Sequence, residues 1–555
     1  GIRAVVAAMR KHGEAQKLAQ EACGALANLC YILENLETIG KEGGIGCVTA
    51  AMRKHGQSKE VQEFGCQALL FLGQDPPNRV TIVEEGGIRV FIGAMRRYVE
   101  TVKVQDQGFR LLTSLAWDDD KNSVQIRQEG GIGAVVAAMK KHVDLTEFQE
   151  RACETLRALA VNADNCVQIV ADGGVRAVIL AMRNHPESAD LQEQGCGALC
   201  NMAANNEESS VRVGAEGGIR AVTTAMTTHA QAAGVQEQGC RTLFFLALKD
   251  DDTFVRIEAA GGVDAVIAAM KNHAESTGVQ EEGCAALRQF ALDNHDVPFK
   301  TWAEKGIWAV LSAMRKLAES ARVQEEGCGA LVGLAGNNDT NLWKIAAAGG
   351  ARTVIAAMRK HADMTAVQEQ GCRVLRVLTS TDDHNRGKIG QEGGVGALVM
   401  AMRGHGESAQ VQKQGCGALC NLAASSRENR VKIGQEGGVR AVVAAMRKHA
   451  ESARVQERGC SALWSLACNE DKNRARVGAE GGVGAVIAAM RKHGKSVRVQ
   501  ERGCGALCCF AGAPDNLARI GADGGVDVVT VAMQNHESSM EVQTLGRAVL
   551  RKLQA

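Results

Sequence analysis

The chain of 555 residues contains nineteen cysteines, and eleven of them recur at one fixed position of a repeated sequence. Thiols can ligate soft metals or form disulfides, but successive members of this series are a whole repeat apart. The total is odd and no CxxC pair occurs, so we predict buried packing residues in a reduced protein. The series is Cys23, Cys66, Cys153, Cys196, Cys240, Cys284, Cys328, Cys372, Cys416, Cys460 and Cys504.

Three CxxxC pairs place two thiols one helical turn apart, a spacing that could hold a soft metal. In each pair the first thiol belongs to the core series, and we expect the second on the exposed side, so no metal site is predicted. We expect Cys508 and Cys509 to be the most exposed thiols. The pairs are Cys196 with Cys200, Cys416 with Cys420, and Cys504 with Cys508.

Histidines recur in the same way, and a row of imidazoles suggests metal binding or a proton relay. Their spacing of one repeat, roughly 10 Å along a stack of helices, is too wide for one ion. We predict instead that each histidine caps the end of a helix. They are His12, His55, His142, His185, His229, His273, His361, His405, His449, His493 and His536.

The chain contains no phosphate-binding glycine loop, paired acid motif, nucleophile elbow or HExxH sequence. Its glycine pairs repeat too regularly to cradle a phosphate at any one place. We therefore expect no catalysis, no cofactor and no metal in this segment.

The second glycine of each pair recurs every 43 or 44 residues. A fixed period of this size is the signature of a solenoid, in which each unit buries its apolar faces against its neighbours. We count thirteen units, the last one cut short. The glycines are Gly1, Gly44, Gly87, Gly131, Gly174, Gly218, Gly262, Gly306, Gly350, Gly394, Gly438, Gly482 and Gly525.

Residues 429–468 show how one unit is built. Residues 429–438 predict a short helix closed by Gly437 and Gly438, which give the backbone the freedom that a sharp turn needs. Residues 439–449 predict a second helix, with one apolar stripe and cations at its end. Residues 455–468 predict a third, longer helix, and nothing alternates with period two. The sequence therefore predicts an all-α fold with three helices per unit.

One glycine stands inside the third helix, directly before the recurrent cysteine, as at Gly415 and Gly459. A glycine there costs about 1 kcal/mol relative to alanine. Eleven units have glycine at this position, and the other two have Ala22 and Ala152. We infer that a neighbouring helix approaches it closely.

Three helices in a little over forty residues, a small-residue turn before the second and a third helix reading GCGALCNLA together resemble the armadillo repeat. The resemblance covers residues 1–555 and implies a right-handed superhelical solenoid. HEAT-type solenoids have a similar period and are the main alternative. The turn glycines and the pairing of a short with a longer helix favour the armadillo type.

No linker, low-complexity segment or charge block divides the chain, so we predict one continuous array over residues 1–555. The first repeat lacks its first helix, and the last repeat ends after its third. We expect further residues before Gly1, or self-association there. No long apolar run or secretory leader is seen, and we expect a cytoplasmic protein. The net charge of +1 gives no bulk attraction to nucleic acid or to membranes.

By the resemblance, the third helices line a concave groove that binds extended peptides, with three positions of each unit facing it. Those positions hold eight Arg or Lys and one Glu, a net charge of +7. Arginine forks bind carboxylates well, and aromatic residues are common at binding hot spots. The residues predicted to bind a partner are Asn28, Phe71, Arg110, Arg157, Asn201, Arg241, Phe244, Phe245, Arg288, Arg373, Arg376, Asn421 and Trp464.

We hypothesise that this groove takes an acidic, extended or helical protein segment with some apolar anchors. Alternatively, the arginines pair with glutamates of adjacent helices. Proteins of the importin-alpha type carry tryptophan four residues before asparagine, whereas Gly24, Gly197 and Gly417 stand at that position here. A basic groove would also repel a basic import signal. The beta-catenin-like proteins, whose basic grooves take acidic segments, are the closer analogy.

One unit, residues 293–308, is irregular. It contains Pro298, replaces the first turn glycine with Lys305 and adds Trp302 and Trp308. The proline either starts the short helix or bends the stack. The tryptophans either fill a gap or form a second contact site, and we favour filling.

These observations predict a non-catalytic scaffold for protein interaction. A second hypothesis is a structural subunit or spacer of a larger assembly, such as a cytoskeletal or ciliary one. A third is the regulatory repeat region of a longer enzyme.

Overall fold

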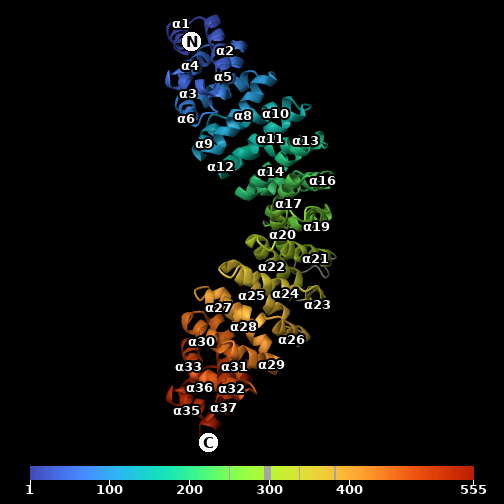
Figure 1. Cartoon of the computed structure of the whole chain (residues 1–555), viewed down its shortest axis with the longest axis vertical. Helices are drawn as coiled ribbons and strands as arrows, with labels where there is room; N and C mark the ends of the chain where they lie inside the picture. The colour runs from blue at the N-terminus through green and yellow to red at the C-terminus, as the bar shows by residue number, and fades with distance from the viewer. Residues whose placement is uncertain (249–250, 293–301, 337, 381–382, 555) are drawn as a thin grey trace. The chain divides into compact units, whose positions relative to one another are not determined.

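The computed structural model describes residues 1–248, 251–292, 302–336, 338–380 and 383–554. These residues form 37 helices and no strand, which confirms the all-α prediction (Figure 1). By its spatial contacts the chain divides into two compact units, Gly1–His273 and Ala274–Ala555. The single continuous array over residues 1–555 stays a prediction.

The first compact unit is built from repeats of three helices, with lengths of nine, eleven and fourteen to seventeen residues. Its helices are α1 (Ile2–His12), α2 (Gln16–Leu29), α3 (Leu33–Lys41), α4 (Gly44–Lys54), α5 (Lys59–Leu72), α6 (Pro76–Glu84), α7 (Gly87–Arg97), α8 (Val102–Asp118), α9 (Asp120–Gln128), α10 (Gly131–Lys141), α11 (Thr146–Leu159), α12 (Ala163–Ala171), α13 (Gly174–Asn184), α14 (Ala189–Asn205), α15 (Glu207–Ala215), α16 (Gly218–Thr228), α17 (Ala233–Ala247), α18 (Asp251–Ala259) and α19 (Gly262–Asn272).

The second unit continues the same order. Its helices are α20 (Thr277–Leu292), α21 (Ala303–Lys316), α22 (Ala321–Ala335), α23 (Asp339–Ala347), α24 (Gly350–Lys360), α25 (Thr365–Leu378), α26 (Asp383–Gln391), α27 (Gly394–Gly404), α28 (Ala409–Ser425), α29 (Arg427–Gln435), α30 (Gly438–Lys448), α31 (Ala453–Ala467), α32 (Asp471–Ala479), α33 (Gly482–Lys492), α34 (Val497–Phe510), α35 (Pro514–Ala522), α36 (Gly525–Asn535) and α37 (Met540–Gln554).

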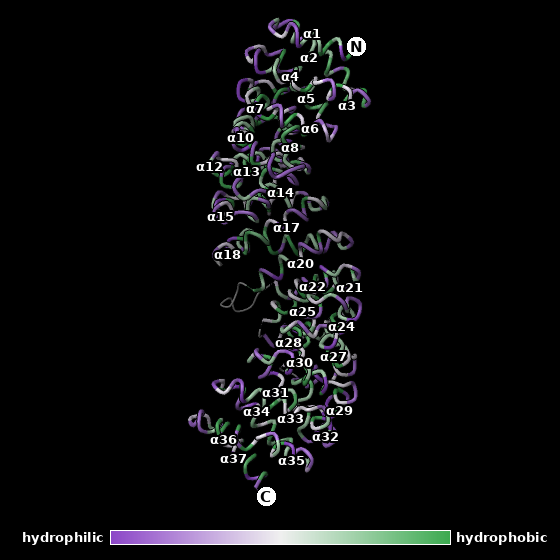
Figure 2. Tube along the Cα trace, turned by 90° about the vertical axis from the view of Figure 1, so that its left-hand side faces the viewer, coloured by the Kyte–Doolittle hydropathy of each residue, from purple (hydrophilic) through white to green (hydrophobic). Residues whose placement is uncertain are grey.

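Helices α29, α30 and α31 confirm the three predicted helices of residues 429–468. The turn between the first two is set by Gly437, whose φ of 81° lies in the left-handed region. Side chains rarely adopt that conformation, so the glycine is required there. Apolar and polar stretches alternate along the chain (Figure 2). The third helices are the most enclosed, and no residue of α28 from Val411 to Ala423 is exposed.

The glycine inside the third helix is explained by a methionine of the second helix. A Cβ atom built on Gly415 would lie 2.6 Å from Cγ of Met402, which is closer than real atoms approach. Gly65 and Gly195 meet Met52 and Met182 in the same way. The predicted close approach is therefore confirmed, and it comes from the second helix of the same unit.

A buried glutamine joins the second and third helices of each unit. Nε2 of Gln412 donates to the carbonyl oxygens of Met402 and His405, both at 2.9 Å. These carbonyls stand at the end of α27, where no further turn of helix can satisfy them. The sequence analysis missed this role, although the glutamine follows the same valine in most units.

Ten of the eleven recurrent histidines stand at the C-terminal caps of second helices, where we predicted them, and His12 is the last residue of α1. Their rings, however, reach the loop of the preceding unit. The Nε2 atom of His449 lies 2.8 Å from the carbonyl oxygen of Gly406, and that of His405 lies 2.8 Å from the oxygen of Ala362. The histidines therefore join adjacent units as well as ending a helix.

All eleven recurrent cysteines are buried, as predicted, and no disulfide occurs among the described residues. Burial raises the pKa of Cys328 and of Cys460 to about 12. The prediction for the outer thiols is wrong at two points. Cys200 is buried rather than exposed, and the most exposed thiol is Cys468, because it stands just past the end of α31.

The tryptophans of the irregular unit differ from each other. Trp302 is buried, so it fills the interior as favoured, whereas Trp308 on α21 is 53% exposed. Pro298 lies outside the described residues. Across the described residues no single helix is long and apolar enough to span a membrane; α12 and α13, bent by 73°, pass that test of length and composition only as a pair.

The contact between methionine and glycine can be tested by substitution. We expect Gly415→Ala to lower the free energy of unfolding by about 1–3 kcal/mol through overpacking, although alanine is the better helix former. Gly404→Ala is the control, since a Cβ atom there meets nothing within 4 Å. The midpoint of urea unfolding measures both. An equal effect of the two changes would contradict the packing account.

Candidate functional site

In the first compact unit, residues 1–273, the predicted binding residues stand in different surroundings. Asn28 on α2 and Arg110 on α8 are exposed. Phe71 on α5 is half-buried, and its ring packs against Tyr31 at 5.0 Å between centroids. Of these residues, only Phe71 belongs to an aromatic cluster.

Further along the first compact unit, the predicted residues of different repeats contact one another. The side chain of Asn201 donates to the carbonyl oxygen of Arg157 at 2.9 Å, so its amide joins two third helices. Arg157 itself donates to Gln194 at 3.2 Å. The guanidinium of Arg241 lies 5.8 Å from the ring centroid of Phe245, within cation–π range, and Phe245 packs on Phe244 at 5.0 Å.

In the second compact unit, residues 274–555, the predicted arginines have different partners. Arg288 forms an ion pair with Glu326 at 3.0 Å, which is the internal pairing we considered as the alternative. Arg376 donates to the neutral Gln414 at 2.7 Å, and no ion pair of Arg373 is found among the described residues. Asn421 donates to the carbonyl oxygen of Arg376 at 3.0 Å.

Large side chains of one unit lie on glycines of the next. A Cβ atom on Gly417 would lie 2.8 Å from Cδ of Arg376, and one on Gly505 would lie 2.7 Å from the ring of Trp464. Gly329 and Arg288 form the same kind of contact. These glycines therefore allow a bulky groove residue to lie flat against the following third helix.

Five cations surround one hollow of about 490 Å³ on helices α25, α28 and α31. We call it the basic groove. Only two carboxylates, Glu369 and Glu457, stand beside the cations, and in the part of the chain that the structure describes none of the five cations forms an ion pair. The cations are Arg373, Arg376, Lys413, Arg454 and Arg458.

The cations of the basic groove repel one another. Burial, followed by the charges of Arg458 and Arg373, lowers the pKa of Arg376. Burial, followed by the charge of Arg454 and then by those of Arg376 and Arg373, lowers the pKa of Lys413, and Glu369 opposes this only in part. An anion placed here would relieve this repulsion, since an opposite charge favours the charged form.

A second hollow of about 660 Å³ adjoins the basic groove, and Glu457 and Arg458 line both. Its apolar wall is Trp464 on α31, with the guanidinium of Arg502 lying 5.9 Å from the indole centroid. Arg498 adds a further cation. The two hollows together offer positive charge next to an aromatic surface.

The sequence analysis found only part of this cluster. Arg373, Arg376 and Trp464 were predicted, but Lys413 and Arg458 lie one helical turn before the three chosen positions of their units. Arg458 and Arg502 stand where several other units have glutamine, such as Gln194, Gln238, Gln370 and Gln414. That change from glutamine to arginine was the signal available in the sequence.

The structure also divides the predicted set between the two units. Arg241, Phe244 and Phe245 belong to the first unit, while Arg288, Arg373, Arg376 and Trp464 belong to the second. Over the described residues no group of three or more His, Cys, Asp or Glu side chains could hold a metal ion.

Comparison with known proteins identifies the family. A family model described as "LRRK2 ARM repeat" matches residues 38–393 and 390–554, which is most of the chain. The chain belongs to the LRRK2 ARM repeat family. This membership confirms the armadillo interpretation over the HEAT alternative. No curated protein matches the chain.

Solved structures share the fold of this LRRK2 ARM repeat chain at low sequence identity. One comes from a study of a conserved phosphorylation switch that controls the interaction between cadherin and beta-catenin. It has a TM-score of 0.68 and 16% identity, and the match covers 88% of this chain and 96% of that one. An engineered protein from the Northeast Structural Genomics Consortium has a TM-score of 0.62 and 24% identity, with coverage of 76% and 99%.

The repulsion within the basic groove predicts an effect on stability. We expect Arg458→Gln, which installs the residue that other units carry, to raise the free energy of unfolding at low salt by about 0.5 kcal/mol, and the gain should fade as salt screens the charges. Arg288→Gln is the control, because it removes a cation that is paired with Glu326. Thermal unfolding at two salt concentrations measures both variants. A loss of stability in Arg458→Gln would contradict the repulsion.

Proposed function

We propose that this LRRK2 ARM repeat chain is a non-catalytic protein-interaction scaffold whose basic groove binds an acidic segment of a partner protein. The observation that carries the proposal is the set of five cations around one hollow, none of which has an ion-paired carboxylate among the residues that the structure describes. In an ordinary protein surface such cations alternate with acids. Here, the missing negative charge is best supplied by a ligand.

The shape of the site favours a segment of chain over a small molecule. The basic groove and the adjoining Trp464 hollow follow the third helices α25, α28, α31 and α34 in succession. An extended segment could place carboxylates against Arg373, Lys413 and Arg458 and an apolar side chain against Trp464. Arginine forks and tryptophan are the groups that most often dominate such interfaces.

The comparison with solved structures supports a protein partner. The structural study that matches this fold concerns the interaction between cadherin and beta-catenin. Armadillo solenoids present a long, regular surface that suits the binding of another chain. We therefore prefer a protein ligand to nucleic acid or a membrane. We also propose that the protein is cytoplasmic, as expected from the sequence.

A second candidate role concerns the protein in which these repeats stand. The family description names LRRK2 repeats, which favours the hypothesis that the chain is the regulatory repeat region of a longer enzyme. Partner binding in the basic groove is compatible with that role. A spacer in a larger assembly has no observation of its own in its favour.

Binding of a defined peptide tests the proposed function. The probe is a fluorescent peptide with four Asp or Glu residues next to a Phe, and its partner probe has Lys at the acidic positions. We expect micromolar binding of the acidic peptide only, weakening as salt rises. The paired change Arg373→Glu with Arg458→Glu should weaken it at least about tenfold, equivalent to 1.4 kcal/mol.

Lys472→Glu is the matched control, since Lys472 is an exposed residue of α32 that does not line the groove. Like each half of the paired change, Lys472→Glu replaces one cation with glutamate. It should leave the affinity for the acidic peptide within about twofold. Equal binding of the acidic peptide by the groove variant and by the control would refute the proposal.

A further inference from the structure

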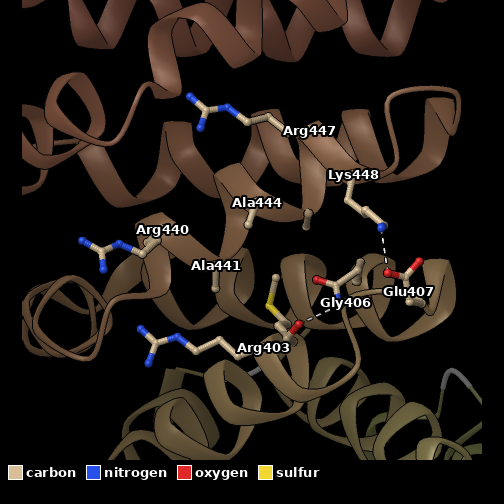
Figure 3. Close-up of a pocket in the computed structure, with 11 residues that line it drawn as sticks. Arg403, Gly406, Glu407, Arg440, Ala441, Ala444, Arg447 and Lys448 are labelled. Carbon is tan, nitrogen blue, oxygen red and sulfur yellow. Dashed lines mark hydrogen bonds and ion pairs between the residues drawn. The ribbon is translucent and has the colours of Figure 1, made fainter.

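A separate hollow lies between the second helices of two adjacent units, α27 and α30 (Figure 3). Its volume is about 720 Å³, larger than that of the basic groove. Its apolar surface comes from Met402, Ala441, Ala444 and Ala445, and the loop at Gly406 closes one end. We call it the second-helix notch. Apart from Gln412 of α28, its lining comes from α27, α30 and the loop after α27, none of which lines the basic groove.

Two small residues line the notch. Ala444 occupies a helix position that holds the larger Leu180 and Met400 in other units. Gly406 occupies a loop position that holds Pro186 in another unit, and a Cβ atom added to Gly406 would meet nothing within 4 Å. Space is therefore left both on the helix and in the loop.

Hollows at the same place in two other repeats, both within residues 1–273, have smaller volumes. Where Gly13 and Ala50 coincide, the corresponding hollow measures about 480 Å³. Where Pro186 and Thr224 coincide, it measures only about 170 Å³. The notch is thus a variable element within an otherwise uniform repeat, as a specific binding surface requires.

Hydrogen bonds and burial hold the base of the notch in place. Gln412 lies beneath it and holds the end of α27 through two hydrogen bonds to carbonyl oxygens. The ring of His449 holds the loop through the carbonyl oxygen of Gly406 at 2.8 Å. Met402, Ala441 and Ala445 are each less than 6% exposed, so they are fixed in the core. A ligand would therefore contact mainly the exposed Ala444, on a base that is already ordered.

The edge of the notch is positively charged. Figure 3 shows the guanidinium groups of Arg403, Arg440 and Arg447 along one side and Lys448 joined to Glu407 at the other. Glu407 is the only carboxylate of the lining, and Lys448 holds it at 2.6 Å. Arg440 is paired with Glu480 at 2.9 Å.

Two of these arginines keep donors available. Arg403 and Arg447 donate through Nη2 to carbonyl oxygens in the turns that follow α29 and α32. Among the described residues, no hydrogen bond is found for Nε or Nη1 of either side chain. Because a guanidinium carries five N–H donors, both can still bind a carboxylate.

We propose that the second-helix notch binds an amphipathic helix of a partner protein, with apolar side chains against Ala444 and Met402 and acidic side chains against Arg403 and Arg447. A helix fits because its apolar side chains, three and four residues apart, gather on one face that can fill a furrow between two other helices. The proposal does not rest on ligand binding in the basic groove.

A selection experiment tests this proposal. A display library of helical peptides, randomised at apolar and charged positions, is enriched on the whole chain and counter-selected on the Ala444→Met variant. Methionine is the residue found at this position in the preceding unit, so the variant fills the notch with a side chain that the repeat tolerates. We expect the enriched peptides to combine an apolar face with Asp or Glu, and to bind Ala444→Met at least tenfold more weakly.

Ala356→Met is the matched control, because Ala356 is exposed at the same position of α24 and lies outside the notch. It should bind the selected peptides as the unchanged chain does, as should the Arg373→Glu with Arg458→Glu variant. Circular dichroism checks the fold of each. Enrichment of no notch-dependent peptide, enrichment of basic peptides, or equal loss in Ala356→Met would overturn the proposal.

Discussion

The contact on which most repeats depend is that of a second-helix methionine with a third-helix glycine. Met402 approaches Gly415 so closely that no side chain fits between them. At this separation Gln412 can reach the last carbonyls of α27 and satisfy them inside the core. Histidines such as His449 then reach the loop of the preceding unit. One steric requirement thus sets the geometry within a unit, and polar side chains join the units.

A regular frame of this kind can hold unfavourable groups at defined places. Arg376 lies flat on Gly417, and Lys413 and Arg458 are fixed beside it by the spacing of successive third helices. Their mutual repulsion costs stability, which the packing of many units offsets. The same frame leaves a deep notch where Gly406 and Ala444 coincide. Both candidate surfaces therefore arise from residues that vary within a constant repeat.

The sequence predicted the fold well because the period and the apolar stripes reflect local geometry. The helices of residues 429–468, the turn at Gly437 and the buried cysteines were all predicted. The site was predicted less completely, because facing positions were chosen by family resemblance. That choice missed Lys413 and Arg458, one turn away. Pairing also depends on the neighbouring repeat: Arg288 forms an ion pair with Glu326, whereas Arg376 donates to the neutral Gln414. No single repeat shows this difference.

Titration of Lys413 tests the central claim, that the positive charges of the basic groove outnumber the carboxylates beside them, most directly. Lysines methylated with ¹³C give separate NMR signals, and Lys413→Arg identifies the signal of interest. The account predicts that the pKa of Lys413 lies below the ordinary lysine value in the free protein and rises when an acidic peptide binds. An ordinary pKa that does not change on addition of saturating peptide would contradict it.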